Sequence, residues 1–432
     1  MFLTLPAWLF LSSGSWFAQI FAVDGSAYAG SFIQTSDRGY LIGGEIEDSY
    51  VTNPDLFLVK LSAGASLEWA IIYEAPCGGL LSLIQTKDGG YAIAGSARYY
   101  RDAGPRCLLI KLRTDGSVEW ARSYGDHLHD EAISVIQTKD GGYLLVGNTK
   151  SFGTGERDIL VIKTDPKGTV SWAKTYGGHG EDRAYSAIRT DDGYVLAGTT
   201  DGFGSGGEDV LVMKISTAGS LKWAYAYGGG GDDVAASLVQ TANKDYCLAG
   251  WTDSFVPDDD RDILVIRLKP DGSLRWANRV GLGENWEDAS SLAQSNDKTI
   301  VLAGTIQIPR GNENDFLAVK LSESGGLAWA RIYRNNDRRD LASSVVQAND
   351  GSFVFSGTTI PFAPDHPGLF VLKMSPEGKG LDCLSDYSPE VANVELSVSR
   401  LSLSVQDCSL ITDSLGQETR MPDFIKPKNF CE

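Results

Sequence analysis

The chain has 432 residues and a formal net charge of −18. This acidic balance argues against nucleic acid and anionic lipid as partners, because both select a basic surface. The length would allow several domains, but a repeat that fills most of the chain indicates a single body instead.

An apolar segment, residues 1–15, opens the sequence and includes Phe2, Trp8 and Phe10. It suits the core of a secretion signal, although no Lys or Arg precedes it, and it is too short to span a bilayer comfortably. We therefore expect a secreted or cell-surface protein, extracellular or periplasmic, without a transmembrane span. Whether the segment is cleaved is left open, but a cut would have to spare Phe17.

A unit of 51 to 54 residues recurs seven times after this segment. Its second apolar stretch carries a glycine at Gly44, Gly95, Gly147, Gly198, Gly250, Gly304 and Gly357. Its third stretch ends in a basic residue at Lys60, Lys111, Lys163, Lys214, Arg267, Lys320 and Lys373. A tryptophan marks the fourth stretch at Trp69, Trp120, Trp172, Trp223, Trp276 and Trp329. Short stretches rich in β-branched and aromatic residues, separated by Asp-Gly turns, predict antiparallel strands A to D.

Seven units of four strands predict an all-β fold, a seven-bladed β-propeller over residues 16–383. Strand A should lie nearest the axis, where a repeated small serine such as Ser134 fits. The B-strand glycine, Gly147 in the third unit, should allow close approach of a neighbouring backbone. The D-strand tryptophan, Trp172 in the same unit, should be buried between adjacent blades.

The two ends of the repeat have complementary defects. Phe17-Ala-Gln-Ile-Phe21 resembles Trp120-Ala-Arg-Ser-Tyr124, so it predicts a D strand without an A, B or C strand before it. The seventh unit lacks the tryptophan of its own D strand in residues 377–383. We expect the N-terminal strand to complete blade seven and close the ring, which also removes an exposed sheet edge.

The B–C loops are long, whereas the A–B and C–D turns are tight. Because strand direction alternates, the B–C and D–A loops emerge on one face, where we expect any binding site. Aromatic residues that break the repeat on this face are Tyr99, Tyr100, Trp251 and Trp286. We predict that they contact a glycan or a protein; packing against neighbouring loops is the alternative.

Two loop clusters could hold a metal. Asp258 and Asp260 could offer oxygen ligands to calcium, with a solvated acidic loop as the alternative. His127 and His129 could ligate a metal in the D–A loop before the third unit, but the acidic position that follows them recurs in other units and should be structural. No cysteine pair has zinc spacing, and no other cofactor is expected.

The chain has six cysteines. Cys77 and Cys107 flank strands A and C of the second blade and could form a disulfide if the loops bring them together. The tail contains Cys383, Cys408 and Cys431, which could pin it by disulfides in an oxidising compartment. Their connectivity is open. Cys247 lies in a B strand and should be a buried thiol.

Residues 384–432 depart from the repeat. Apolar residues alternate with polar ones in two groups, Val394, Leu396 and Val398 and then Leu401, Leu403 and Val405. This alternation predicts a C-terminal β-rich tail with two strands, which could form a hairpin on the rim of the propeller. Such strands could instead complete the sheet of a neighbouring chain and give a homo-oligomer.

The sequence Asp-Gly-Gly-Tyr, then Asp-x-x-x-x-Lys, then Asp-Gly-Ser-x-x-Trp-Ala resembles the units of bacterial and archaeal secreted β-propeller repeat proteins, over residues 17–382. Asp115-Gly-Ser-Val-Glu-Trp120 is also similar to the tryptophan-docking repeat of quinoprotein-like propellers. Enzymes of that second family are expected to have eight blades and a quinone with calcium in the channel. With seven units and no recognisable quinone ligands, the resemblance favours a propeller without catalysis.

Three functions follow as hypotheses. The first is a binding or scaffold propeller that recognises a protein or glycan through its B–C and D–A loop face. The second is a structural subunit of an extracellular assembly joined through the tail. The third is an enzyme, either a quinoprotein-like oxidoreductase or a polysaccharide-active hydrolase or lyase, although no catalytic residues are predicted.

Overall fold

The computed structural model describes most of the repeat region and parts of the tail. The described residues are 17–21, 26–47, 54–74, 77–97, 104–256, 260–281, 285–308, 313–333, 338–361, 367–379, 384–386, 390–395, 397–400, 404–407, 411–414 and 426–429.

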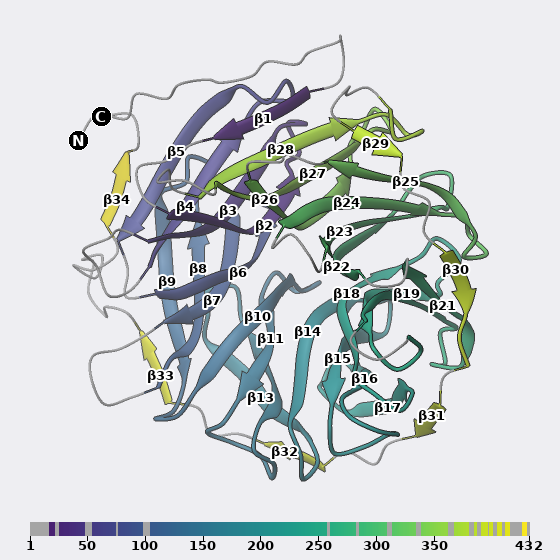
Figure 1. Cartoon of the computed structure of the whole chain (residues 1–432). Coiled ribbons are helices and arrows are strands. Elements are labelled where there is room, and N and C mark those ends of the chain that lie inside the picture. The colour runs from purple at the N-terminus through teal and green to yellow at the C-terminus, as the bar shows by residue number, and fades with distance from the viewer. Residues whose placement is uncertain are drawn as a thin grey trace.

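Seven antiparallel sheets surround a common axis, and the strand predicted as A lies innermost in each blade (Figure 1). The strands of blades one to three are β2 (Ser26–Gln34), β3 (Tyr40–Glu47), β4 (Asp55–Leu61) and β5 (Leu67–Glu74); β6 (Cys77–Gln85), β7 (Tyr91–Ala97), β8 (Arg106–Leu112) and β9 (Val118–Gly125); and β10 (Asp130–Gln137), β11 (Tyr143–Thr149), β12 (Asp158–Thr164) and β13 (Val170–Gly177). The strands of blades four to six are β14 (Asp182–Arg189), β15 (Gly193–Thr200), β16 (Asp209–Ser216) and β17 (Leu221–Gly228); β18 (Asp233–Gln240), β19 (Tyr246–Thr252), β20 (Asp262–Leu268) and β21 (Leu274–Gly281); and β22 (Trp286–Gln294), β23 (Ile300–Ile308), β24 (Glu313–Leu321) and β25 (Leu327–Tyr333). The predicted seven-bladed propeller is confirmed.

Blade seven closes the ring in the predicted way. It consists of β26 (Arg338–Gln347), β27 (Phe353–Pro361) and β28 (Gly368–Met374), completed by β1 (Phe17–Phe21) from the start of the chain. Phe17 lies opposite Lys373 and Phe21 opposite Leu369 in the antiparallel pair. Strands from the two ends of the repeat therefore share one sheet, so the ring cannot open without breaking this pair.

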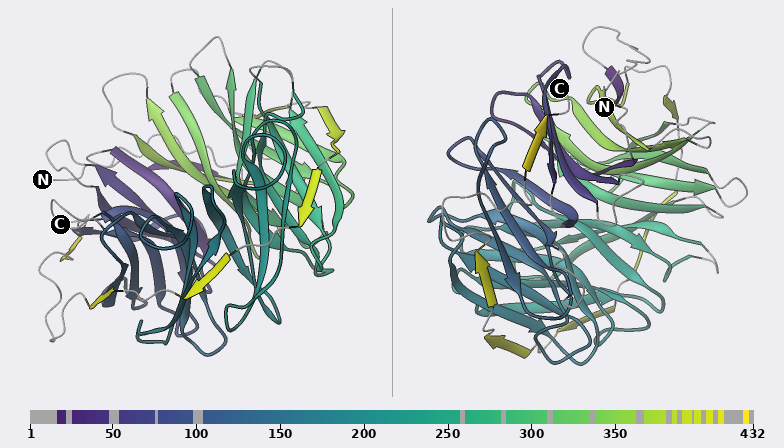
Figure 2. Two further views of the ribbon diagram at one scale, coloured as in Figure 1. Left: turned by 90° about the horizontal axis from the view of Figure 1, so that it is seen from below. Right: turned by 90° about the vertical axis from the view of Figure 1, so that its left-hand side faces the viewer.

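The tail forms a belt of single strands and not a hairpin. One short tail strand pairs with the outer strand of each of six blades: β29 (Leu384–Asp386) with β25, β30 (Glu390–Asn393) with β21, β31 (Ser397–Arg400) with β17, β32 (Ser404–Asp407) with β13, β33 (Ile411–Ser414) with β9 and β34 (Lys426–Asn429) with β5. These strands, here called the C-terminal belt, follow the outside of the ring in Figures 1 and 2. The hairpin prediction was wrong because the open edge of each blade offers a backbone partner.

The register of the belt is regular. The residues opposite Tyr333, Val280, Tyr227, Tyr176 and Tyr124 on successive blades are Leu384, Val391, Val398, Val405 and Thr412. Each of these belt residues follows the previous one by seven positions. A stride of seven residues thus carries the chain from one blade to the next, and the belt pairs within its own molecule.

The repeated residues mostly join neighbouring blades. The A-strand serine accepts a backbone N–H from the next blade; the Leu83 N–H donates to Ser31 Oγ over 3.1 Å. The B-strand glycine leaves no room for a side chain, because a Cβ on Gly147 would lie 1.8 Å from the Glu131 carbonyl oxygen at the A-strand bulge. The repeated serine is therefore a hydrogen-bond acceptor between blades, and the repeated glycine is needed because the neighbouring backbone leaves no room for a side chain.

Aromatic residues of the D strands also bridge the blades, although the repeated tryptophans are partly and not fully buried. Trp120 packs against Tyr143 of the next blade with ring centroids 5.8 Å apart. The hydroxyl of Tyr124 donates to the carbonyl of Gly168 in the next C–D turn over 2.7 Å, and Tyr73, Tyr176 and Tyr227 make the equivalent bond. The core accordingly lies between blades: one apolar cluster joins buried residues of blades one and two. The described residues include no helix that could cross a membrane.

Candidate functional site

Blades five and six meet on the B–C and D–A loop face at a junction that contains three of the sequence-predicted residues. Trp251 lies near the end of β19, Asp260 just before β20 and Trp286 at the start of β22. The B–C loop of blade five docks on blade six, since the Glu287 N–H donates to the Arg261 carbonyl over 2.7 Å and Arg261 forms a parallel bridge with Trp286. We call this region the five–six junction.

Two tryptophans hold an arginine at the five–six junction. The guanidinium carbon of Arg261 lies 3.6 Å from the ring centroid of Trp251 and 5.5 Å from that of Trp286. Cation–π attraction of this kind stabilises a planar guanidinium over an indole face. Trp286 is 43% exposed, so part of its ring faces solvent. We call Trp251, Arg261 and Trp286 the aromatic clamp.

Three carboxylates lie next to the aromatic clamp. Asp260, Asp262 and Glu287 are buried, and one carboxylate oxygen of each lies within 4.8 Å of the others. Asp260 Oδ1 accepts the Arg261 backbone N–H over 2.8 Å, and Asp262 Oδ2 pairs with Arg279 Nη1 over 2.5 Å. We call these residues the carboxylate cluster. Oxygen donors alone, in this number, suit a hard cation such as calcium.

Sequence reasoning found only part of the carboxylate cluster. Asp260 was predicted, but Asp262 and Glu287 were not singled out, because acids recur at both positions in other units. The signal that was missed is a change in the repeat: Glu287 stands where blades three, four, five and seven have Asp130, Asp182, Asp233 and Asp340. The longer side chain changes what the position can reach.

The junctions of blade three with blade four and of blade four with blade five each carry a buried pair of acids, Asp158 with Asp182 and Asp209 with Asp233. Burial, together with a weaker effect of Asp233, raises the pKa of Asp209 to about 6. Burial likewise raises the pKa values of Asp158, Asp182 and Asp233, even though hydrogen bonds from the loops and neighbouring strands partly stabilise the charged forms. Each group is buried in the blade seam, so its ionised form loses hydration on folding.

We predict that the thermal stability rises as the pH falls from 7 to about 4.5. A carboxyl with a raised pKa destabilises the fold when ionised, and for Asp209 this cost disappears as the pH drops from about 6 towards its unfolded value near 4. Below about pH 4 the trend should reverse, because groups such as Asp140, whose pKa the Thr138 hydroxyl and Lys163 ammonium lower to about 2, become protonated. Melting curves between pH 3 and 8 test this. The Asp209→Asn variant should show a smaller rise, and a melting temperature that is flat between pH 7 and 5 would contradict the prediction.

The predicted histidine pair does not join a metal cluster among the described residues. His127 Nε2 lies 3.3 Å from Asp126 Oδ1, and His129 Nε2 lies 3.3 Å from Glu131 Oε2. The two rings therefore face different carboxylates, and the side chain of His127 is 75% exposed. Tyr99, Tyr100 and Asp258 lie outside the described residues.

The disulfide considered for Cys77 and Cys107 is not found, because Cys107 is a buried free thiol. Cys77 lies opposite Ala97 of β7, and Cys107 lies opposite Ser96 on the other edge of the same strand. Two strand spacings, about 10 Å, separate them, which is too far for a disulfide. Cys247 is a buried thiol, as predicted. The tail cysteines Cys383, Cys408 and Cys431 lie outside the described residues.

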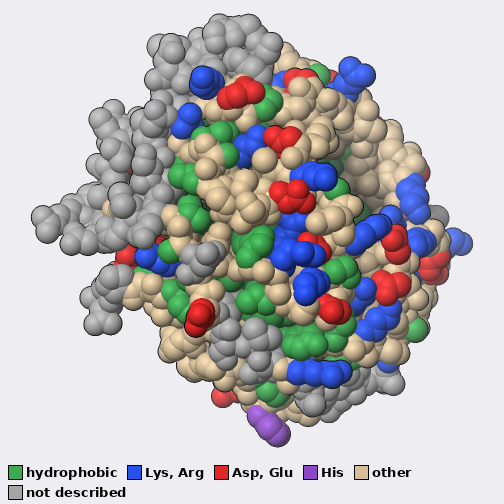
Figure 3. Space-filling model, turned by 90° about the vertical axis from the view of Figure 1, so that its right-hand side faces the viewer, with side chains coloured by type: hydrophobic (Ala, Val, Ile, Leu, Met, Phe, Trp, Pro, Cys, Tyr) green, Lys and Arg blue, Asp and Glu red, His purple; other side chains and the backbone are tan. Residues whose placement is uncertain are grey.

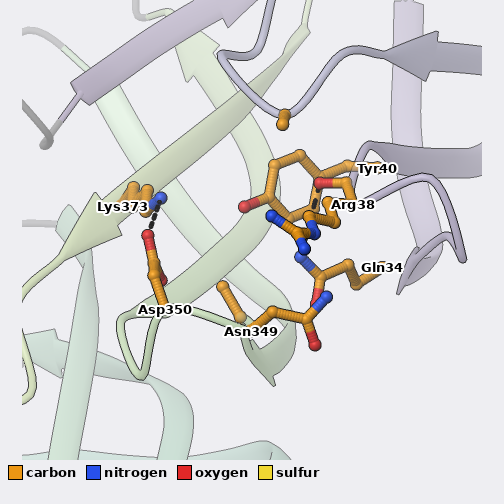
Figure 4. Close-up of a pocket in the computed structure, with 8 residues that line it drawn as sticks. Gln34, Arg38, Tyr40, Asn349, Asp350 and Lys373 are labelled. Carbon is orange, nitrogen blue, oxygen red and sulfur yellow. Dashed lines mark hydrogen bonds and ion pairs between the residues drawn. The ribbon is translucent and has the colours of Figure 1, made fainter.

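A pocket of about 350 Å³ opens on the opposite face, at the seam between blades seven and one (Figure 4). Its lining includes Gln34, Arg38, Tyr40 and the ion pair of Asp350 with Lys373, whose charged atoms lie 2.7 Å apart. A wider hollow of about 770 Å³ lies on blades five to seven. Turn residues and strand ends of neighbouring blades line both hollows.

No protein-family model matches the sequence. No curated protein matches it either. Among solved structures, a similar chain is a hypothetical protein from Leishmania major; it is 10% identical, with 58% of this chain and 87% of that chain covered and a TM-score of 0.31. A likeness this remote says nothing of function, and the resemblance to secreted repeat propellers or quinoproteins stays a prediction.

Proposed function

We propose that the protein is a binding module that recognises a neutral glycan at the aromatic clamp. The observation that carries this proposal is the half-exposed ring of Trp286, held beside Arg261 and backed by carboxylates. An indole face offers apolar area to the C–H face of a sugar ring, while the neighbouring guanidinium of Arg261 can donate hydrogen bonds to hydroxyls. An extracytoplasmic location belongs to the same proposal and is supported by the apolar segment 1–15.

The scatter of exposed apolar side chains favours a glycan over a large protein partner. Among the described residues, the exposed large hydrophobics are Tyr28, Leu81, Leu128, Trp286 and Leu327. They are spread over blades one, two and six and the loop before blade three, and the two on blade six, Trp286 and Leu327, lie on its first and fourth strands. Protein interfaces instead use contiguous apolar patches. Figure 3 shows acidic and basic side chains interspersed on the right-hand flank of the ring, without a field of one sign. A small ligand that stacks on one ring needs neither.

We predict that Trp286→Ala weakens glycan binding at least about tenfold, because truncation of a tryptophan anchor costs about 2 kcal/mol. Screening the full chain on an array of neutral oligosaccharides, followed by calorimetry with the best ligand, measures the effect. Leu128→Ala is the matched control, since Leu128 is 57% exposed on the same face but lies at a different junction.

Equal binding by Trp286→Ala and the wild type would contradict the proposed site. Failure of every oligosaccharide to bind, with capture of a purified surface protein that depends on Trp286, would replace the glycan with a protein partner.

A further inference from the structure

We propose that Asp260, Asp262 and Glu287 bind a calcium ion that fastens the B–C loop of blade five to blade six. Nothing in the recurring pattern of the blades requires three acids to meet at one point. Two oxygens on one calcium ion lie no more than about 5.2 Å apart, since each Ca–O distance is 2.3–2.6 Å. The carboxylate oxygens of these three residues lie within 4.8 Å of one another, so one ion can touch all three.

Asp260 provides an independent indication of a ligand. Its side chain is 6% exposed, and its Oδ2 atom is buried without a hydrogen-bond partner among the described residues. A buried polar atom without a hydrogen-bond partner lowers the stability of the fold by about 1–3 kcal/mol. The other oxygen, Oδ1, is already fixed by the Arg261 N–H. A cation next to Oδ2 would remove the cost and explain why the loop places an acid there.

The three negative charges of the carboxylate cluster also favour a cation at this point. The three carboxylates carry three negative charges, and Arg279 neutralises one through its contact with Asp262. Arg261 directs its guanidinium to the face of Trp251 instead. Three buried carboxylates this close together repel one another, and a divalent cation among them would offset that repulsion. All the donors are oxygens, and a loop supplies one of them, which suits calcium better than zinc.

Comparison with other blades shows what is different about blade six. In blades three and five the acid at the equivalent of Glu287 is capped by a threonine across the strand pair, as Thr252 Oγ1 donates to Asp233 Oδ1 over 2.5 Å. Asp233 also accepts from Ser254 Oγ over 2.6 Å. Opposite Glu287 stands Ile306, which has no hydroxyl to donate. Blade six thus exchanges a capped Asp for a longer Glu beside an additional acid, Asp260.

A bound ion would also hold the residues of the aromatic clamp in place. Asp260 directly precedes Arg261, and Glu287 directly follows Trp286, so ligation of both acids would hold the two neighbouring clamp residues in register. The site would exist whether or not a glycan binds beside it, so the two proposals can fail separately.

Titration of the chelator-treated full chain with calcium chloride tests the site by calorimetry, and terbium luminescence excited through tryptophan reports the same event. Indoles sit beside the cluster, so bound terbium should be sensitised. We expect Asp260→Asn to lose one bound equivalent, or to weaken that site at least about tenfold, because calcium affinity follows the charge of the ligands. The control is Asp209→Asn, the counterpart of Asp262 at the junction where Asp209 and Asp233 are the buried acids, which should bind as the wild type does.

Glu287→Gln is the second variant and should match Asp260→Asn, with circular dichroism showing that each is folded. No calcium binding by the wild type, or unchanged binding in both cluster variants, would overturn the site. Displacement of calcium by magnesium at equal concentration would overturn its assignment to calcium. Loss of calcium binding with retained glycan binding would separate this site from the proposed function.

Discussion

Removal of residues 384–432 should lower the melting temperature by about 5 °C or more and cause the protein to self-associate. The C-terminal belt covers the outer strands of six blades, so its removal leaves six rows of unpaired backbone N–H and C=O groups. Such edges pair readily with other chains. Each tail strand contributes only three or four residues, but the losses add over six separate sheets.

A graded pair of truncations tests this prediction. Ending the chain after residue 425 removes only β34 and uncovers blade one, whereas ending it after residue 383 uncovers all six outer strands. Melting curves and light scattering after size exclusion should show a small change for the first and a large one for the second. Identical melting temperatures and masses for the two truncations would show that the belt does not protect the edges.

The propeller was predictable because every unit repeats the same strands and turns, and because the defects at the two ends match. The path of the tail was not. Alternation around Val398 and Val405 predicts strands correctly, but it does not reveal which edge each strand will join. That choice depends on the distance between neighbouring outer strands, which a stride of seven residues happens to span. Only the assembled ring supplies that distance.

The candidate site also contains residues that the sequence predicted and residues that it did not. Trp251, Trp286 and Asp260 break the repeat, and for that reason the sequence singled them out. Asp262 and Glu287 do not stand out, because acids recur at both positions to hold loops at the other junctions. Their new role arises from the neighbours: Ile306 replaces a threonine opposite Glu287, and the loop folds Asp260 inward. A repeated residue can thus serve a local function once its surroundings change.

The buried ion pair of blade five should be the most sensitive charged pair in the ring. In most blades a lysine at the end of strand C pairs with an aspartate of the A–B turn; Lys373 and Asp350 are an example, and the side chain of Asp350 is 53% exposed. Blade five has Arg267 and Asp245 instead, with side chains only 1% and 2% exposed. Arg267 Nε donates to Asp245 Oδ2 over 3.2 Å, and Arg275 Nε lies 2.7 Å from the same oxygen.

Asp245→Asn should therefore destabilise the protein by about 3–5 kcal/mol, because it leaves the Arg267 guanidinium charged in a place that water does not reach. Asp350→Asn removes the same charge from an exposed partner and should cost no more than about 1 kcal/mol. Both variants change the net charge equally, so any difference reports burial. Urea midpoints and melting temperatures measure the two costs side by side. Equal shifts would mean that Asn243 and Thr241, which accept hydrogen bonds from Arg267 Nη2, are sufficient to stabilise the buried cation.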